Sequence, residues 1–191
     1  IRRFKEAALE SRTPRLTWHH SLIQSSFARE RGDFAEADRY ANEAMMQGAA
    51  AFLPDTLGAV VLHRMIVALH RENLVASLPQ FVHFRTIQPD NPLAYACLSL
   101  SMAQAGDLDG ARAPFAQALE LLGGGLTEIG VLSLGVTVEA AVALAAHGEA
   151  AGIRGLLAPF DGLFLTFGQV IGTLGPAGRY LGLLAWLEGD A

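Results

Sequence analysis

Apolar residues recur at intervals of three and four along most of the chain, which is the spacing of one face of an α-helix. The pattern is clearest over residues 86–120, where two such stretches are separated by Gly106 and Asp107. The positions that follow this spacing are Tyr95, Leu98, Ser99 and Met102 before the break and Ala111, Phe115 and Ala118 after it. Pro92 suits the first turn of a helix, and glycine commonly ends one. This region is therefore predicted to form a helix, a sharp turn and a second helix.

The same arrangement recurs at intervals of 34 to 42 residues, measured between predicted turns at Gly32, Glu72, Gly106, Gly148 and Gly189. Mostly small residues lie seven positions before each turn, namely Ser25, Met65, Ser99, Ala141 and Gly182. Nine positions after the first four turns lie Ala41, Phe81, Phe115 and Leu157. Small residues let two paired helices approach closely, whereas larger ones fill the space between pairs. We therefore predict an all-α fold of about four to five degenerate helix pairs.

The turns and prolines also predict where each helix pair begins and ends. The expected pairs cover residues 14–51, 52–88, 90–124 and 129–160, followed by an incomplete pair at 176–191. Residues 161–175 are largely apolar but contain several glycines, so they are expected to form an irregular loop packed on the helices. The whole of 1–191 is expected to be a single helical-repeat domain.

Both ends of the chain fall within a predicted repeat, which indicates a fragment of a longer protein. Terminal repeats normally carry a polar outer face. The last predicted helix instead offers four large apolar residues with no helix following them, namely Leu183, Leu184, Trp186 and Leu187. An alternative is that this face pairs with a second copy of the chain as a homodimer.

The region 86–120 resembles the tetratricopeptide repeat in the order of its features. These features are an aromatic residue after the prolines, a small residue at Ser99, a Gly-Asp turn and an Ala–Phe–Ala series. The resemblance implies a tetratricopeptide-like, right-handed α-α solenoid. Most of the intervals between turns exceed the strict 34-residue period of that family, which implies irregular curvature.

Residues 157–188 are similar to a segment of the C-terminal helical-repeat regions of large bacterial signalling ATPases. These include LuxR-type ATP-binding transcriptional regulators and ATPase-linked adenylate/guanylate cyclases. The matching residues are Leu157, Pro159 and Phe160, and then Arg179, Tyr180, Leu181, Gly182, Leu183, Leu184 and Ala185. Because the ATPase and output domains of that family lie elsewhere, the resemblance implies a non-catalytic interaction or sensing domain of a bacterial signalling or transcription regulator.

Charge and composition limit the class of partner. Residues 1–90 carry a net charge of +1 and residues 91–191 carry −6, and such an acidic body repels nucleic-acid phosphates. The most apolar stretch, 162–178, is too short and too rich in glycine to span a membrane. The single cysteine, Cys97, excludes an internal disulfide. We therefore expect a cytoplasmic protein that binds neither nucleic acid directly nor membranes.

No arrangement typical of catalysis, metal binding or cofactor binding is present in the sequence. His19 and His20 are adjacent and face different ways on a helix, whereas His63 and His70 share a side without a matching carboxylate or cysteine. The glycines of 168–178 match neither a P-loop nor a dinucleotide fingerprint. Ser21, Ser25 and Ser26 lie on a helix without a nucleophile elbow. We therefore expect no enzyme activity, no metal and no cofactor.

The first helices of stacked repeats line a concave groove in solenoid proteins. The polar residues expected to face it are Arg29, His63, Arg64, Tyr95, Gln104 and Arg179. The expected partner is a protein or peptide, including other domains of the parent chain. The alternative is a stand-alone small-molecule binder with an apolar pocket near residues 161–180, walled by Phe164, Phe167 and Tyr180.

Overall fold

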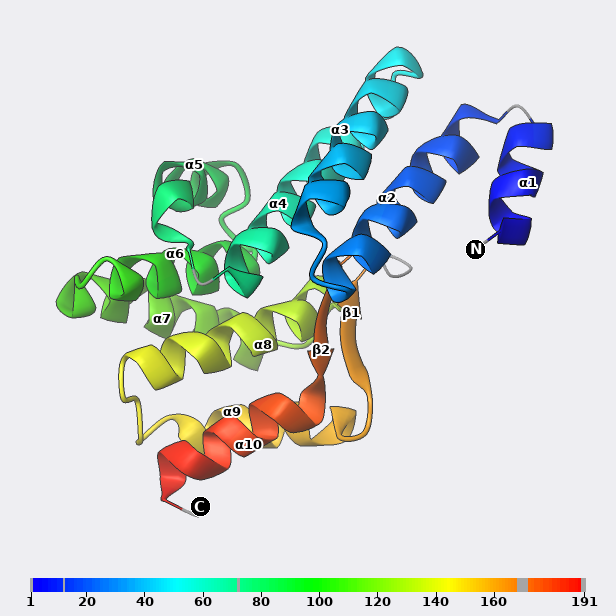
Figure 1. Ribbon diagram of the computed structural model, residues 1–191. Coiled ribbons are helices and arrows are strands. Elements are labelled where there is room, and N and C mark those ends of the chain that lie inside the picture. Colours follow the sequence, from blue (N-terminus) through cyan, green and yellow to red (C-terminus); the bar gives the residue numbers. More distant parts are fainter. Residues whose placement is uncertain (1, 12, 72, 168–171, 190–191) are drawn as a thin grey trace. The chain divides into compact units, whose positions relative to one another are not determined.

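The computed structural model describes residues 2–11, 13–71, 73–167 and 172–189, and these are mostly helical (Figure 1). The prediction of a helical fold is confirmed for this part of the chain. Its residues form ten α-helices, two short 3-10 helices and two short strands. Along the described stretches no helix combines the length and the apolar character needed to cross a bilayer.

The described residues divide into two compact units, one of residues up to 70 with Gly172 and one of residues 71–167 with 173–189. The helices of the first unit are α1 (Arg2–Glu10), α2 (Pro14–Glu30), α3 (Phe34–Ala50) and α4 (Thr56–His70). The second unit begins with η1 (Val75–Ser77), α5 (Leu78–Ile87), α6 (Pro92–Gln104), α7 (Leu108–Gly123) and α8 (Glu128–Ala143). It continues with α9 (Ala150–Leu157), η2 (Ala158–Phe160), β1 (Phe164–Phe167), β2 (Gly172–Pro176) except its first residue, and α10 (Ala177–Glu188). The predicted pair 52–88 therefore supplies α4 to one unit and α5 to the other, and a single domain over 1–191 stays a prediction.

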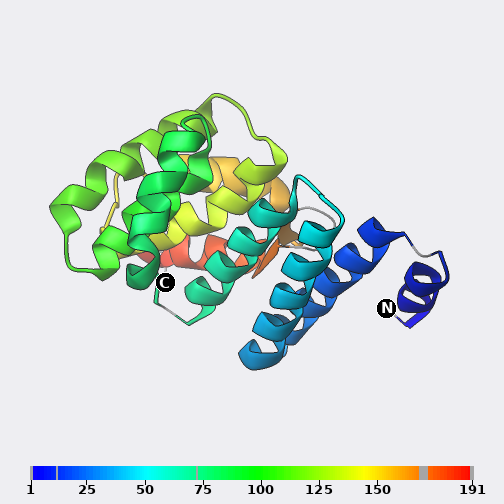
Figure 2. The same cartoon turned by 90° about the horizontal axis from the view of Figure 1, so that it is seen from above.

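In the first unit, α2 and α3 form an antiparallel hairpin whose turn has a defined chemistry (Figure 2). Gly32 lies in the connection between the two helices. It has the left-handed conformation, with a φ of 76°, which glycine adopts without strain. The side chain of Asp33 then caps α3 by accepting a hydrogen bond from the backbone N–H of Glu36 at 3.0 Å. Across the hairpin, the Ser25 hydroxyl donates to the Ala37 carbonyl at 2.7 Å. A buried side chain thus joins the two helices next to their turn.

The hairpin of α6 and α7 in the second unit is built in the same way. Gly106 has a φ of 85°, and Asp107 caps α7 by accepting a hydrogen bond from the backbone N–H of Gly110 at 2.9 Å. The Ser99 hydroxyl donates to the Ala111 carbonyl at 2.9 Å, across the same twelve positions that separate Ser25 from Ala37. The sequence repeat therefore corresponds to one local structure that occurs in both units.

The predicted irregular loop at 161–175 instead contains β1 and most of β2, which pair in a two-stranded sheet. Residues 168–171 of that prediction lie outside the described residues. Leu165 is buried whereas Phe164 and Thr166 are exposed, which is the alternation of a strand with one covered face. Glycines that exclude a long helix are compatible with this extended backbone.

The last described helix does not leave an apolar face uncovered. In α10, Leu184 and Leu187 are buried within the second unit, where the helix packs on α8 and α9. Of the four apolar residues that the sequence predicts to be unpartnered, only Trp186 is largely exposed, at 59%. The expectation of a continuous exposed face on this helix was wrong because the chain folds back onto α8.

The connection between α8 and α9 includes the turn that the sequence predicts at Gly148, but its left-handed residue is not this glycine. The residue in the left-handed conformation is Ala145, with a φ of 49°, and its side chain is exposed. A left-handed backbone costs a non-glycine residue about 1–2 kcal/mol. Ala145→Gly is therefore expected to raise the free energy of unfolding by about 1 kcal/mol, measured by urea unfolding.

Ala116→Gly serves as the matched control, because Ala116 is exposed in the interior of α7. That change is expected to lower the free energy of unfolding by about 1 kcal/mol. Equal effects of the two substitutions would contradict the assigned conformation of Ala145.

Candidate functional site

The six residues predicted to line a groove lie in both units. Arg29, His63 and Arg64 belong to the first unit, and Tyr95, Gln104 and Arg179 belong to the second. Arg29 and His63 are buried, Tyr95 is half-buried, and the other three are exposed. The structure therefore brings two of the six together, Arg29 and His63, and a groove shared by all six stays a prediction.

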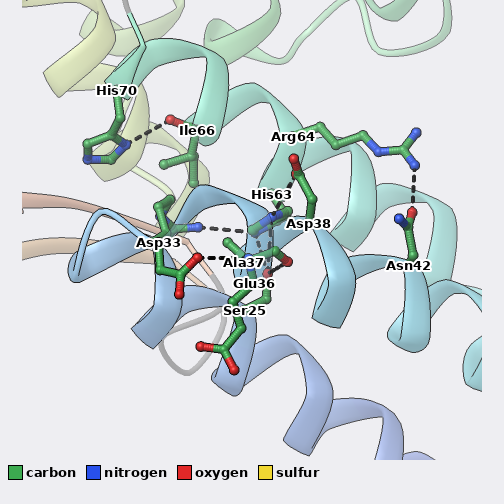
Figure 3. A network of polar contacts seen from close by, with 11 residues as sticks. Ser25, Asp33, Glu36, Ala37, Asp38, Asn42, His63, Arg64, Ile66 and His70 are labelled. Carbon is green, nitrogen blue, oxygen red and sulfur yellow. Dashed lines mark hydrogen bonds and ion pairs between the residues drawn. The ribbon is translucent and has the colours of Figure 1, made fainter.

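Three of the predicted groove residues have partners within their own units. Arg64 Nη2 donates to Asn42 Oδ1 at 3.1 Å, between α4 and α3 (Figure 3). Gln104 Oε1 accepts a hydrogen bond from the backbone N–H of Leu74 at 2.9 Å. Arg179 forms an ion pair of 2.6 Å with Glu139 and lies over the ring of Tyr180 at 4.8 Å. These side chains have structural roles whether or not they also meet a ligand.

The first unit contains a buried polar cluster that joins three helices, and we call it the His63 network. It consists of Ser25 and Arg29 on α2, Ala37 and Asp38 on α3, and His63 on α4. Ser25 Oγ lies 2.9 Å from Nδ1 and 3.0 Å from Nε2 of His63, and Arg29 Nη1 lies 3.3 Å from Nδ1. Figure 3 shows His63 between Ser25 and Asp38.

These contacts determine the protonation state of His63. Because the Ser25 hydroxyl donates to the Ala37 carbonyl, its oxygen can only accept a hydrogen bond from the imidazole. Arg29 is always a donor, so Nδ1 of His63 accepts from it and the ring proton lies on Nε2. Burial, together with the charges of Arg29 and Arg64, lowers the pKa of His63 to about 3. His63 is therefore neutral near pH 7.

The proximity of Ser25, His63 and Asp38 resembles a nucleophilic triad in composition only. Ser25 has no exposed surface and its proton is held by the Ala37 carbonyl, so it is closed to a substrate. The Asp38 carboxylate is 4.0 Å from His63 Nε2, which is too long for the hydrogen bond that orients a catalytic histidine. Ser99 makes the same bond to a backbone carbonyl. We conclude that Ser25 joins the two helices of its hairpin.

Arg29 is the charged member of the network and is only 2% exposed. Its Nη1 donates to neutral His63, whereas Nε and Nη2 have no hydrogen-bond partner among the described residues. The nearest carboxylate oxygen, Glu30 Oε1, is 3.7 Å from Nη2. Burial lowers the pKa of Arg29, and the neighbouring Glu30 charge opposes that shift. A buried guanidinium with two unsatisfied donors is unusual in a folded protein.

The sequence predicts that Arg29 and His63 share one surface, but it does not predict the contact of His63 with Ser25. Ser25 was recognised as a small repeat position, and that position predicts its proximity to α3. Nothing in the spacing predicts that His63, on the following helix, would reach the same hydroxyl. The sequence places His70 on the same side of a helix as His63. In the structure His70 is exposed, and its Nδ1 donates to the Ile66 carbonyl at 2.8 Å.

The residues expected to wall an apolar pocket near 161–180 have separate environments. Phe164 is 61% exposed, Phe167 is half-buried, and Tyr180 is buried with its hydroxyl donating to the Leu174 carbonyl at 2.9 Å. Among the described residues, no three His, Cys, Asp or Glu side chains are grouped to hold a metal ion. Burial raises the pKa of the Cys97 thiol, so this cysteine is a poor nucleophile.

Comparisons with known proteins assign no family to this chain, so its own geometry is the basis for proposing a function. No protein-family model matches the sequence, and no match was found among curated proteins or solved structures.

Proposed function

We propose that this chain is a tetratricopeptide-like helical-repeat domain that binds a protein segment, within a bacterial signalling or transcription regulator. The domain would act without catalysis, by presenting stacked helix pairs to a partner, to another domain of its parent chain or to a second copy. Repeat domains of this type use extended helical surfaces for binding.

The observation that supports this proposal is the repeated hairpin. In α2–α3 and in α6–α7 a left-handed glycine, an aspartate cap and a serine-to-carbonyl bond occur at equivalent positions. Two occurrences of one unusual combination favour a repeated module over an unrelated helical bundle. The solenoid arrangement and its right hand are part of the proposal.

Several large apolar side chains project from the helices, and one from the turn after α3, and they are candidates for partner contact. Phe52 is 92% exposed, and its φ of 52° is strained for a phenylalanine. Ile87 is 60% exposed and Trp186 is 59% exposed. Exposed aromatic anchors commonly dominate the binding energy of protein interfaces.

The proposal is tested with the purified full chain. Partners captured from an extract of the source cells are purified, and their dissociation constants are measured by calorimetry, while light scattering measures self-association. At least one of Phe52→Ser, Ile87→Ser and Trp186→Ser is expected to weaken binding about tenfold or more. Asp109→Ser, at an exposed position of α7, is the control and should bind as the wild type does.

A chain that stays monomeric and binds no purified partner would overturn the proposal. So would a partner whose affinity is unchanged in all three variants, since the exposed anchors would then have no part in recognition.

A further inference from the structure

The guanidinium of Arg29 presents one edge without hydrogen-bond acceptors. Nη1 is used by His63, and the unpartnered groups are Nε and Nη2. In a guanidinium, Nε–H and one N–H of Nη2 point in parallel along the same edge. This pair of donors matches the two oxygens of a carboxylate. The unsatisfied donors are thus arranged as a two-pronged site.

The backbone around Arg29 does not supply acceptors for this edge. Arg29 is close to the C-terminal end of α2, where free carbonyl groups would normally be found. The carbonyls of Phe27, Ala28 and Arg29 already accept hydrogen bonds from the backbone N–H groups of Arg31, Gly32 and Asp33. The Nε and Nη2 donors of Arg29 have no hydrogen-bond partner among the described residues.

Glu30 lies where an acceptor is needed but does not complete the bond. Its Oε1 is 3.7 Å from Arg29 Nη2, beyond hydrogen-bond distance, and its side chain is 38% exposed. The exposed part of this side chain leaves it room to rotate toward solvent. Glu30 is therefore the carboxylate that a ligand would replace beside Nη2.

We propose that the Nε–Nη2 edge of Arg29 binds the carboxylate of a small organic acid, which takes the place of the Glu30 side chain. The ligand must be small because the two nitrogen atoms are enclosed in the absence of a ligand. A planar carboxylate fits because it replaces another carboxylate and offers two oxygens to the two parallel donors. Asp38, Glu30, Arg64 and neutral His63 are the titratable neighbours of the site.

This inference goes beyond the proposed function, since a partner-binding domain need not bind an organic acid. It gives the first unit a candidate effector site at the junction of α2, α3 and α4. Its failure would leave the protein-binding proposal standing, because that proposal depends on exposed side chains elsewhere.

The experiment compares unfolding midpoints of the full chain in sodium acetate, sodium chloride and sodium sulfate at equal ionic strength. The variant Glu30→Gln removes the competing carboxylate, and Glu10→Gln, at an exposed position of α1, is the charge-matched control. Acetate is expected to raise the midpoint of Glu30→Gln in a saturable manner, since a native-state ligand stabilises by mass action. Its acetate dissociation constant should be about tenfold lower than that of the wild type and of Glu10→Gln.

Arg29→Lys in the Glu30→Gln background is expected to lose the acetate effect, because lysine has no parallel pair of donors. If that double variant does not fold, the Glu30→Gln result alone decides. Equal midpoints in acetate and chloride would overturn the proposal, and stabilisation by sulfate alone would contradict the carboxylate class. Binding of a capped glutamyl peptide without binding of acetate would equally contradict a small organic acid as ligand.

Discussion

Replacing Gly135 by alanine is expected to lower the free energy of unfolding by about 2 kcal/mol, although alanine is the better helix former. Gly135 is buried in α8, beneath the β1–β2 hairpin and α10. A Cβ atom built there would lie 2.8 Å from Leu174 Cδ1 and 3.2 Å from both Leu165 Cδ1 and Tyr180 Cζ. The Tyr180 ring is further restrained by its bond to the Leu174 carbonyl. Three side chains from three elements would have to move, which exceeds the helix-propensity gain.

Gly155→Ala is the matched control for this prediction. Gly155 is an exposed residue of α9, and no atom lies within 4 Å of a Cβ built there. This substitution is expected to raise the free energy of unfolding by about 0.5–1 kcal/mol. Urea unfolding followed by far-UV circular dichroism measures both variants. If Gly135→Ala is as stable as Gly155→Ala, the hairpin does not pack on α8 as described.

The features that the sequence predicts well are those determined by neighbouring residues. The break at Gly106 and Asp107 predicts a turn, and the structure has a left-handed glycine followed by an aspartate cap. Proline is unfavourable inside a helix, and α9 gives way to η2 beside Pro159. Each of these features depends on the conformational preferences of a few neighbouring residues. The local sequence is therefore sufficient to predict it.

Features determined by distant residues were not predicted. Gly135 has no local reason to be glycine, and its partners lie 30 to 45 positions later in the chain. The strands within residues 164–176 were not predicted, because the glycines there argue against a helix but do not indicate a sheet. The turn that the sequence predicts at Gly148 is present, but its left-handed position is filled by Ala145 and not by a glycine, which the sequence does not predict.

The same limit applies to the candidate site. Arg29 and His63 were selected from the sequence as polar residues of first helices, which predicts exposure in a groove. In the structure they are buried, where His63 contacts the Ser25 hydroxyl and Arg29 donates to His63. A periodic pattern identifies which side of a helix is covered, but not which polar groups find partners there.

His63 is expected to make the free energy of unfolding strongly dependent on pH. The unfolded chain protonates this histidine below about pH 6.5, whereas the folded chain holds it neutral until about pH 3. Between these values the unfolded state binds one more proton, so stability falls as the pH falls. From about pH 7.5 to about pH 5 the loss attributable to His63 is expected to be about 2 kcal/mol.

The main physical cause is the burial of the ring, and the neighbouring cations lower the pKa of His63 further. Protonated His63 would carry its charge 3.3 Å from Arg29 Nη1 and close to Arg64, in a site where only 1% of the histidine is exposed. Asp38 at 4.0 Å and Glu30 beyond Arg29 are the carboxylates that face this charge. Since neither forms a hydrogen bond to the ring, they do not offset the repulsion and the lost solvation.

The contribution of His63 is separated from that of the carboxylates by comparing variants over the same pH range. His63→Gln keeps a neutral side chain that can both donate and accept, and it should reduce the pH-dependent loss by about 2 kcal/mol. His83→Gln, at an exposed position of α5, should leave the loss close to that of the wild type. Urea unfolding at a series of pH values gives the pH dependence of the free energy of unfolding for the wild type and both variants. If His63→Gln and the wild type lose stability in parallel, the imidazole is not buried beside Arg29, and the first unit is assembled differently.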